Sequence, residues 1–78
     1  MPHIVVKLWP GSTPDQKLRL TDHIVQGVAD ILHNGKASVS VGFEEVPPGR
    51  WQTAVFEPEI LDRWDTLTKH PGYGERPG

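Results

Sequence analysis

The sequence predicts an α/β protein (α+β in some classifications), built on a βαβ unit with parallel strands, a long crossover helix and a second C-terminal helix. Three observations lead to this prediction: an apolar β-branched stretch opens the chain, apolar residues at helical spacing follow, and a second alternating stretch comes next. Two strands joined by a helix-length connection run parallel with a right-handed crossover. We expect one domain over residues 1–78, with residues 72–78 as a flexible tail.

The first strand is predicted over residues 3–9, because HIVVKLW is rich in β-branched and aromatic residues and ends at Pro10-Gly11. Ile4 and Val6 share one face of this strand, and Val5 lies on the other. Since both faces carry apolar side chains, both need a covering layer.

A long helix is predicted from Pro14 to about His33. Thr13 stands at the N-cap, proline at the first helical position and Gln16 at the third, which together form a capping box. The apolar residues that recur at helical spacing are Leu20, Ile24, Val28 and Ile31. We expect Asn34-Gly35 to supply the left-handed residue that ends the helix.

The second strand is predicted over residues 38–46, where Val39, Val41 and Phe43 alternate with small residues. After a break at Pro47-Pro48-Gly49, we expect residues 51–56 to form a short extended or hairpin segment. The second helix is then expected to open at Glu57-Pro58-Glu59, with acidic residues in its first turn, and to end at Pro71-Gly72.

The composition argues against several classes of protein. The formal net charge is −2 and the 8 Lys and Arg residues are scattered, so we expect no nucleic acid partner. The apolar runs fall far short of the roughly 18 residues of a membrane span, and no signal peptide opens the chain, so we expect a cytoplasmic protein. With 0 cysteines and no metal-ligand spacing among the 4 histidines, we expect no metal site.

The size of the chain predicts self-association. A domain of 78 residues buries too little surface to be stable without help. The crossover helix can cover only one face of a two-stranded sheet, and a second copy of the chain is the simplest cover for the other face. We therefore expect an obligate homo-oligomer.

Pro2 is the first candidate for chemistry. Removal of Met1, favoured by a small second residue, would leave a secondary amine held rigidly at the start of a strand. Burial of such an amine in an apolar pocket disfavours its cation and lowers its pKa, and a neutral amine near pH 7 acts as a general base.

In the order, spacing and length of its motifs, the chain resembles the 4-oxalocrotonate tautomerase family. The ending and the second helix are similar to the bacterial subgroup named for phenylenolpyruvate tautomerase. The segments that carry the resemblance are Met1-Pro2-His3-Ile4, Asp15-Gln16-Lys17, Ser38-Val39-Ser40-Val41, Trp51-Gln52 and Lys69-His70-Pro71-Gly72-Tyr73.

The resemblance implies a specific activity and assembly. The N-terminal proline of such enzymes moves a proton from an enol oxygen to carbon, so a 2-hydroxydienoate or an enolpyruvate becomes its keto form. The substrate is a small carboxylic acid, no cofactor is needed, and a homodimer is favoured over a hexamer. Pro2 is then the catalytic residue.

The sequence departs from the hexameric members of the family at the substrate-binding positions. Their arginine after the first strand is replaced here by Gly11-Ser12-Thr13, and their arginine in the second strand by Ser40. Trp51 stands where the family has a pocket phenylalanine. This pattern favours a monocarboxylate with an apolar body over a dicarboxylate, with Arg50 as a candidate source of positive charge.

The candidate substrate-binding residues are therefore Ser40, Trp51, His3 and Arg50. Two other functions stay open at this point. The first is a haloacrylate dehalogenase-like hydratase, which needs a carboxylate and the arginines that are missing. The second is a non-catalytic βαβ dimer that binds a partner or a ligand.

Overall fold

The computed structural model describes residues 1–74, and predictions for residues 75–78 lie outside the described residues. The chain forms two compact units, Met1–Glu45 and a second unit that begins at Val46, and each is described by itself. The expectation of one domain over residues 1–78 stays a prediction.

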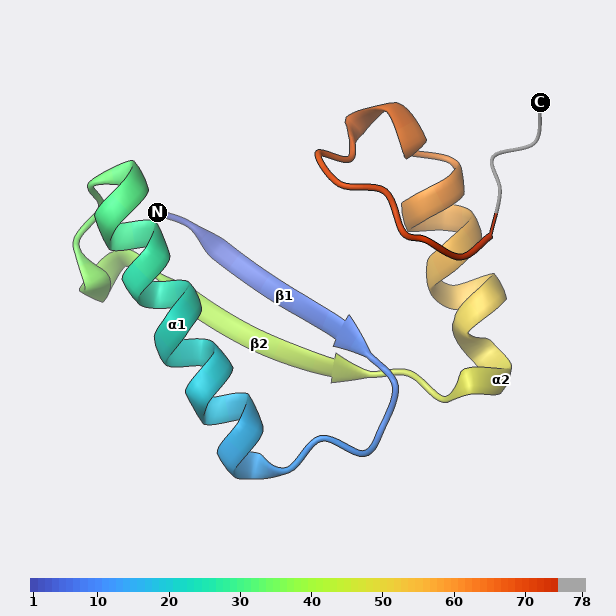
Figure 1. The fold of residues 1–78 in the computed structure, drawn as a ribbon, viewed down its shortest axis with the longest axis horizontal. Coiled ribbons are helices and arrows are strands. Elements are labelled where there is room, and N and C mark those ends of the chain that lie inside the picture. The colour runs from blue at the N-terminus through green and yellow to red at the C-terminus, as the bar shows by residue number, and fades with distance from the viewer. Residues whose placement is uncertain (75–78) are drawn as a thin grey trace. The chain divides into compact units, whose positions relative to one another are not determined.

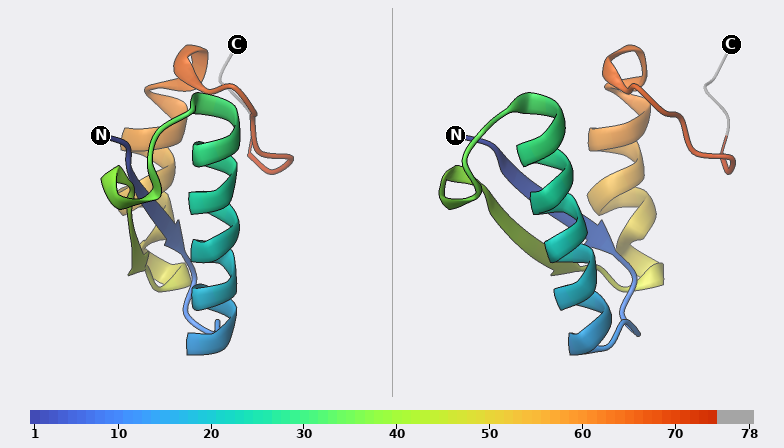
Figure 2. Two further views of the ribbon diagram at one scale, coloured as in Figure 1. Left: turned by 90° about the vertical axis from the view of Figure 1, so that its left-hand side faces the viewer. Right: turned by 60° about the vertical axis from the view of Figure 1, so that its left-hand side comes forward.

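The first unit is the predicted βαβ unit. Strand β1 (His3–Leu8) leads into helix α1 (Pro14–Leu32), and a 3₁₀ turn, η1 (Lys36–Ser38), precedes strand β2 (Ser40–Glu45). The two strands pair in parallel, which confirms the predicted sheet. Helix α1 lies along one side of this sheet (Figures 1 and 2).

The start of α1 and its end near His33 are confirmed, but the left-handed residue that ends it differs from the prediction. The Thr13 hydroxyl accepts the Gln16 amide at 3.1 Å, and the Gln16 side chain accepts the Thr13 amide at 2.9 Å, which completes the capping box. At the other end, His33 has the left-handed conformation with φ of 60°, whereas Gly35 has φ of −63°. Asn34-Gly35 was the wrong choice because histidine also tolerates the left-handed region.

The register divides the sheet into two unlike faces. Pairing of Val6 with Phe43 places apolar side chains of both strands on the α1 side, all of them only partly buried. The opposite face carries His3, Ser40 and Val5, and the Val5 side chain is 47% exposed. No residue of Met1–Glu45 is buried, so this unit has no closed core of its own.

Helix α1 also exposes apolar residues. Ile31 is 76% exposed, and Leu18 and Leu32 are exposed as well. Leu18, Val25 and Leu32 follow each other at seven-residue spacing, so they lie along one stripe of the helix. The first unit therefore presents apolar surface on its helix and on its open sheet face.

The second unit is helical from its start, and the structure corrects three predictions here. Helix α2 (Pro48–Trp51) continues directly into the π-helical segment η2 (Gln52–Leu61), and a 3₁₀ turn, η3 (Trp64–Thr66), follows. Residues 51–56 are thus helical rather than extended. The helix opens at Pro48 and not at Glu57, and it ends before Pro71-Gly72.

Proline explains the unusual winding of this second helix. Pro48 occupies the first helical position, where a missing N–H is tolerated. Pro58 lies inside η2, where its ring conflicts with the i−4 carbonyl of an ordinary α-helix. The wider π turns accommodate it, as in the Asp62 amide that donates to the Glu57 carbonyl at 3.0 Å. Val46, Val55 and Phe56 are the buried apolar side chains of this unit.

Among residues 1–74, no helix is long and apolar enough to cross a membrane. A cytoplasmic location stays a prediction.

Loss of the Thr13 cap should weaken α1. Thr13→Ala removes the acceptor of the Gln16 amide, and we expect the free energy of unfolding to fall by about 1 kcal/mol. Urea denaturation at one fixed protein concentration measures this difference. Thr68→Ala, at an exposed threonine outside the helices, is the control and should stay within about 0.5 kcal/mol of the parent. An equal loss in both variants would contradict the role of the cap.

Candidate functional site

The start of the parallel sheet brings Pro2, His3 and Ser40 together. The Ser40 amide donates to the Pro2 carbonyl at 3.1 Å, which holds the proline against the beginning of β2. The register pairs His3 with Ser40 directly, and the His3 Nδ1 lies 2.6 Å from the Ser40 Oγ. Three of the five residues selected from the sequence therefore form one corner of the first unit.

This corner is polar and open. The His3 and Ser40 side chains are exposed, whereas Pro2 is half-buried. Serine carries one donor and two acceptor lone pairs, and neutral histidine has one donor and one acceptor nitrogen. The contact between His3 and Ser40 uses only one hydrogen-bonding group of each side chain. The remaining donor and acceptor groups can therefore bind a ligand beside the proline.

Met1 controls the chemistry available to Pro2. While Met1 is attached, the Pro2 nitrogen is part of an amide and is not basic. Met1 is 95% exposed, and the peptide bond that it forms with Pro2 is trans. The residue to be removed is therefore accessible at the surface.

Lys7 occupies the same sheet face farther along β1. Its ammonium lies 3.6 Å from a Glu44 carboxylate oxygen, and the two residues are register partners. Opposite charges facing each other across a strand pair stabilise the sheet modestly. Lys7 thus has a structural partner on the strand next to it.

The other two candidates, Arg50 and Trp51, are neighbours at the end of α2 in the second unit. Trp51 is half-buried, and its indole N–H donates to the Tyr73 hydroxyl at 3.0 Å. Arg50 is exposed and forms no ion pair with another of residues 1–74. The structure brings Trp51 together with Tyr73, and Arg50 adjoins Trp51 in the chain.

Tyr73 is a residue that sequence reasoning missed. It was assigned to the flexible tail, but its ring lies against Phe56, with centroids 5.9 Å apart, in addition to its contact with Trp51. The signals in the sequence were its place in the segment Lys69-His70-Pro71-Gly72-Tyr73 that carries the family resemblance, and an aromatic residue within a glycine- and proline-rich ending.

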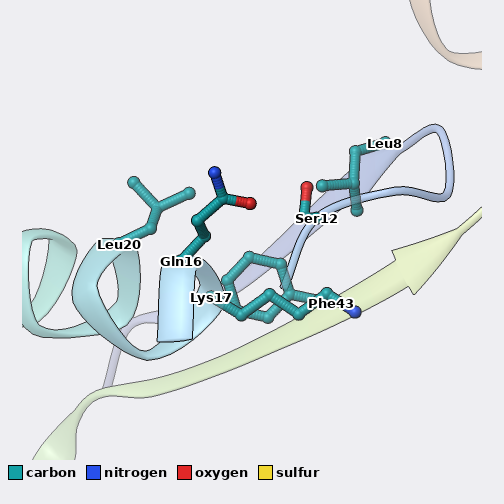
Figure 3. Close-up of a pocket in the computed structure, with 6 residues that line it drawn as sticks. All are labelled: Leu8, Ser12, Gln16, Lys17, Leu20 and Phe43. Atoms are coloured by element: carbon teal, nitrogen blue, oxygen red, sulfur yellow. The ribbon is translucent and has the colours of Figure 1, made fainter. Parts of the chain in front are cut away.

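A hollow of about 180 Å³ opens at the opposite end of β1 from Pro2 (Figure 3). It lies between the sheet and the first turns of α1, and Ser12 is part of its wall. One side is charged, because Lys17 pairs with Glu45 at 3.2 Å. A strand of this length separates the hollow from Pro2 by about 20 Å. The lining residues are Leu8, Ser12, Gln16, Lys17, Leu20 and Phe43.

No three His, Asp or Glu side chains within residues 1–74 gather closely enough to hold a metal ion.

Comparison with known proteins identifies the family of the chain. Residues 2–56 match the family model described as tautomerase enzyme. Tautomerase PptA of Cronobacter sakazakii is 40% identical over 74 residues, which cover 94% of this chain and 97% of that protein. A probable tautomerase of Xylella fastidiosa is 37% identical over 75 residues, which cover 96% and 92%. The crystal structure of DmpI from Helicobacter pylori superposes with a TM-score of 0.56 at 35% identity, over 59% of this chain and 78% of that chain.

Proposed function

Because the chain belongs to the tautomerase family and is an isomerase, we propose that it interconverts the enol and keto forms of a small carboxylic acid, with the Pro2 amine as the base. The substrate class is a 2-hydroxydienoate or an enolpyruvate. The observation that carries this proposal is the position of Pro2, tied by its carbonyl to the Ser40 amide and lying beside the exposed His3–Ser40 pair.

The proposed reaction moves one proton. Once Met1 is removed, the neutral Pro2 amine takes the proton from the enol hydroxyl, and the oxygen becomes the carbonyl oxygen of the product. The electrons of the former carbon–carbon double bond then take the same proton from the proline ammonium at carbon. No atom is gained or lost, so the amine returns to its starting state.

The substrate contacts follow from the same residues. We propose His3 and Ser40 of the first unit as hydrogen-bonding groups for the substrate, and Trp51 and Arg50 of the second unit as an aromatic and a cationic substrate contact. With serine at both positions of the family arginines, a single carboxylate on an apolar body suits this set better than two carboxylates. Phenylenolpyruvate is a substrate of this type.

A homo-oligomer, with a dimer favoured over a hexamer, is part of the proposal. The first unit has no buried residue, one open sheet face and an apolar stripe on α1. Removal of such surface from water contributes about 25 cal/mol per Å², so a second copy of the chain would stabilise it strongly.

The role of Pro2 is tested by blocking its nitrogen. A variant with Gly-Ser fused before Pro2 keeps the proline ring but makes the nitrogen an amide. We expect its kcat/KM for phenylenolpyruvate to fall by roughly 10²- to 10⁴-fold, and we expect Pro2→Ala to lose activity as well. Ketonisation is followed by absorbance, on protein whose intact mass proves that Met1 is gone.

His23→Ala, at an exposed position of α1, is the control and should keep full activity. Full turnover by the blocked variant would rule out Pro2 as the base. The same preparations incubated with 3-chloroacrylate test the hydratase alternative, which predicts release of chloride.

Ser40 is tested as a substrate-binding residue. Ser40→Ala removes the hydroxyl that lies 2.6 Å from His3, and a lost hydrogen bond to a charged ligand should raise KM by about tenfold or more. Ser38→Ala is the matched control, because within the described residues 1–74 the Ser38 hydroxyl bonds only to the Gly35 carbonyl. Steady-state kinetics on both variants compare the two serines. An equal KM for Ser40→Ala and the parent would remove Ser40 from the substrate site.

Assembly is tested on the open sheet face. Val5→Lys places a charge at the centre of that face, and we expect the chain to dissociate or unfold at micromolar concentration. Gln26→Lys adds the same charge at an exposed position of α1 outside the apolar stripe and should leave the assembly intact. Sedimentation velocity and circular dichroism report on mass and fold. A parent chain that sediments as a stable folded monomer would refute the oligomer.

A further inference from the structure

The segment Leu67–Gly74, which we call the strap, follows η3 and turns back within the second unit (Figure 1). In the middle of the strap, His70 contacts Trp64. The His70 ring stacks on Trp64 with centroids 4.3 Å apart and an interplanar angle of 15°. Its Nε2 lies 2.9 Å from the Trp64 carbonyl, so one tautomer donates a hydrogen bond there.

Tyr73 and Gly74 hold the end of the strap against Phe56. The Tyr73 ring contacts Phe56 in a tilted arrangement of 40°. Gly74 has φ of +68°, and a Cβ at this position would lie 2.5 Å from the Phe56 Cζ. A residue without a side chain is therefore needed both for the backbone conformation and for the close approach. These contacts fix where the Tyr73 hydroxyl lies.

The Tyr73 hydroxyl does not use its O–H donor in its contact with Trp51. An indole N–H can only donate, so in the 3.0 Å contact with Trp51 the phenol oxygen is the acceptor. Among residues 1–74, Trp51 is the only hydrogen-bond partner of this hydroxyl. Tyr73 is 52% exposed, so its phenol O–H is accessible to solvent or to a ligand.

We propose that Tyr73 binds the substrate, with its hydroxyl donating a hydrogen bond to the substrate carboxylate at the edge of the Trp51 wall. This inference rests on the proposed function, which supplies a carboxylic acid with an apolar body. It names a donor for the carboxylate in a chain with serine at the positions of the family arginines. The exposed guanidinium of Arg50, next to Trp51 in the chain, favours an anion in the same region.

The acceptor role of Tyr73 also strengthens its donor role. A hydroxyl that accepts from the Trp51 N–H is polarised toward giving its own proton, as in other hydrogen-bonded chains. A neutral phenol matches one carboxylate and does not attract a second one as an arginine does. Tyr73 thereby selects for monocarboxylates.

Tyr73→Phe tests the inference, because it removes the hydroxyl and keeps the ring that lies on Phe56. We expect KM for phenylenolpyruvate to rise about tenfold, with kcat within about twofold of the parent. The Kd of phenylacetate, measured by calorimetry, should rise by the same factor, and this arm needs no turnover. Thr68→Ala, also on the strap, should change neither constant.

A second variant separates binding by Tyr73 from positioning of Trp51. Trp51→Phe keeps an aromatic ring but removes the indole N–H. If Tyr73 contacts the carboxylate itself, adding Tyr73→Phe to Trp51→Phe still weakens phenylacetate binding severalfold. If Tyr73 acts only by orienting the indole, the second change has no effect in this background. Benzyl alcohol, which lacks the carboxylate, should show no dependence on Tyr73.

The outcomes are distinguishable. A parent enzyme without turnover on enol acids overturns the proposed function, while the phenylacetate measurements still decide the role of Tyr73. An active parent with unchanged KM and Kd in Tyr73→Phe overturns this inference alone. Loss of the effect in the Trp51→Phe background also overturns it, in favour of a positioning role. Circular dichroism and tryptophan fluorescence on each variant establish that the fold is retained.

Discussion

The structure depends above all on the parallel pairing that begins where the Ser40 amide donates to the Pro2 carbonyl. This bond sets the register of β1 against β2, and the register decides which side chains share each face of the sheet. It places His3 opposite Ser40 beside the proline, and it turns Val6 and Phe43 toward α1. A slip of one residue would exchange the two faces, so the polar corner and the apolar layer are consequences of the same interaction.

Local signals in the sequence were enough for the first unit. The Thr13–Gln16 capping box and the two alternating segments act over a few residues, so their pattern is visible without a structure. The second unit was harder to predict. Val55 and Phe56 have strong strand propensity, and Pro58 suggested a helix start, yet tertiary burial and π turns draw all of them into one helix.

The candidate site divides in the same way. Pro2, His3 and Ser40 lie at the ends of paired strands, so a βαβ prediction already implies that they are near each other. Trp51 was selected by resemblance, and its partner Tyr73 lies 22 positions farther along the chain. No periodicity connects residues across such a separation, and a glycine-rich ending favours disorder on composition alone. Only the packing on Phe56 reveals that Tyr73 and Gly74 are part of the second unit.

The first unit contains the proposed base, and none of its residues is buried. For an obligate assembly, the folded fraction follows mass action, since each added chain shifts the balance toward the complex. Dilution would then lower the fraction of folded, active enzyme rather than the turnover rate of each active site. The specific activity would therefore decrease as the enzyme is diluted. In a cell that makes such a protein, total enzyme activity would rise more steeply than in proportion to the amount of protein expressed. Gene dosage would then regulate the flux through the reaction.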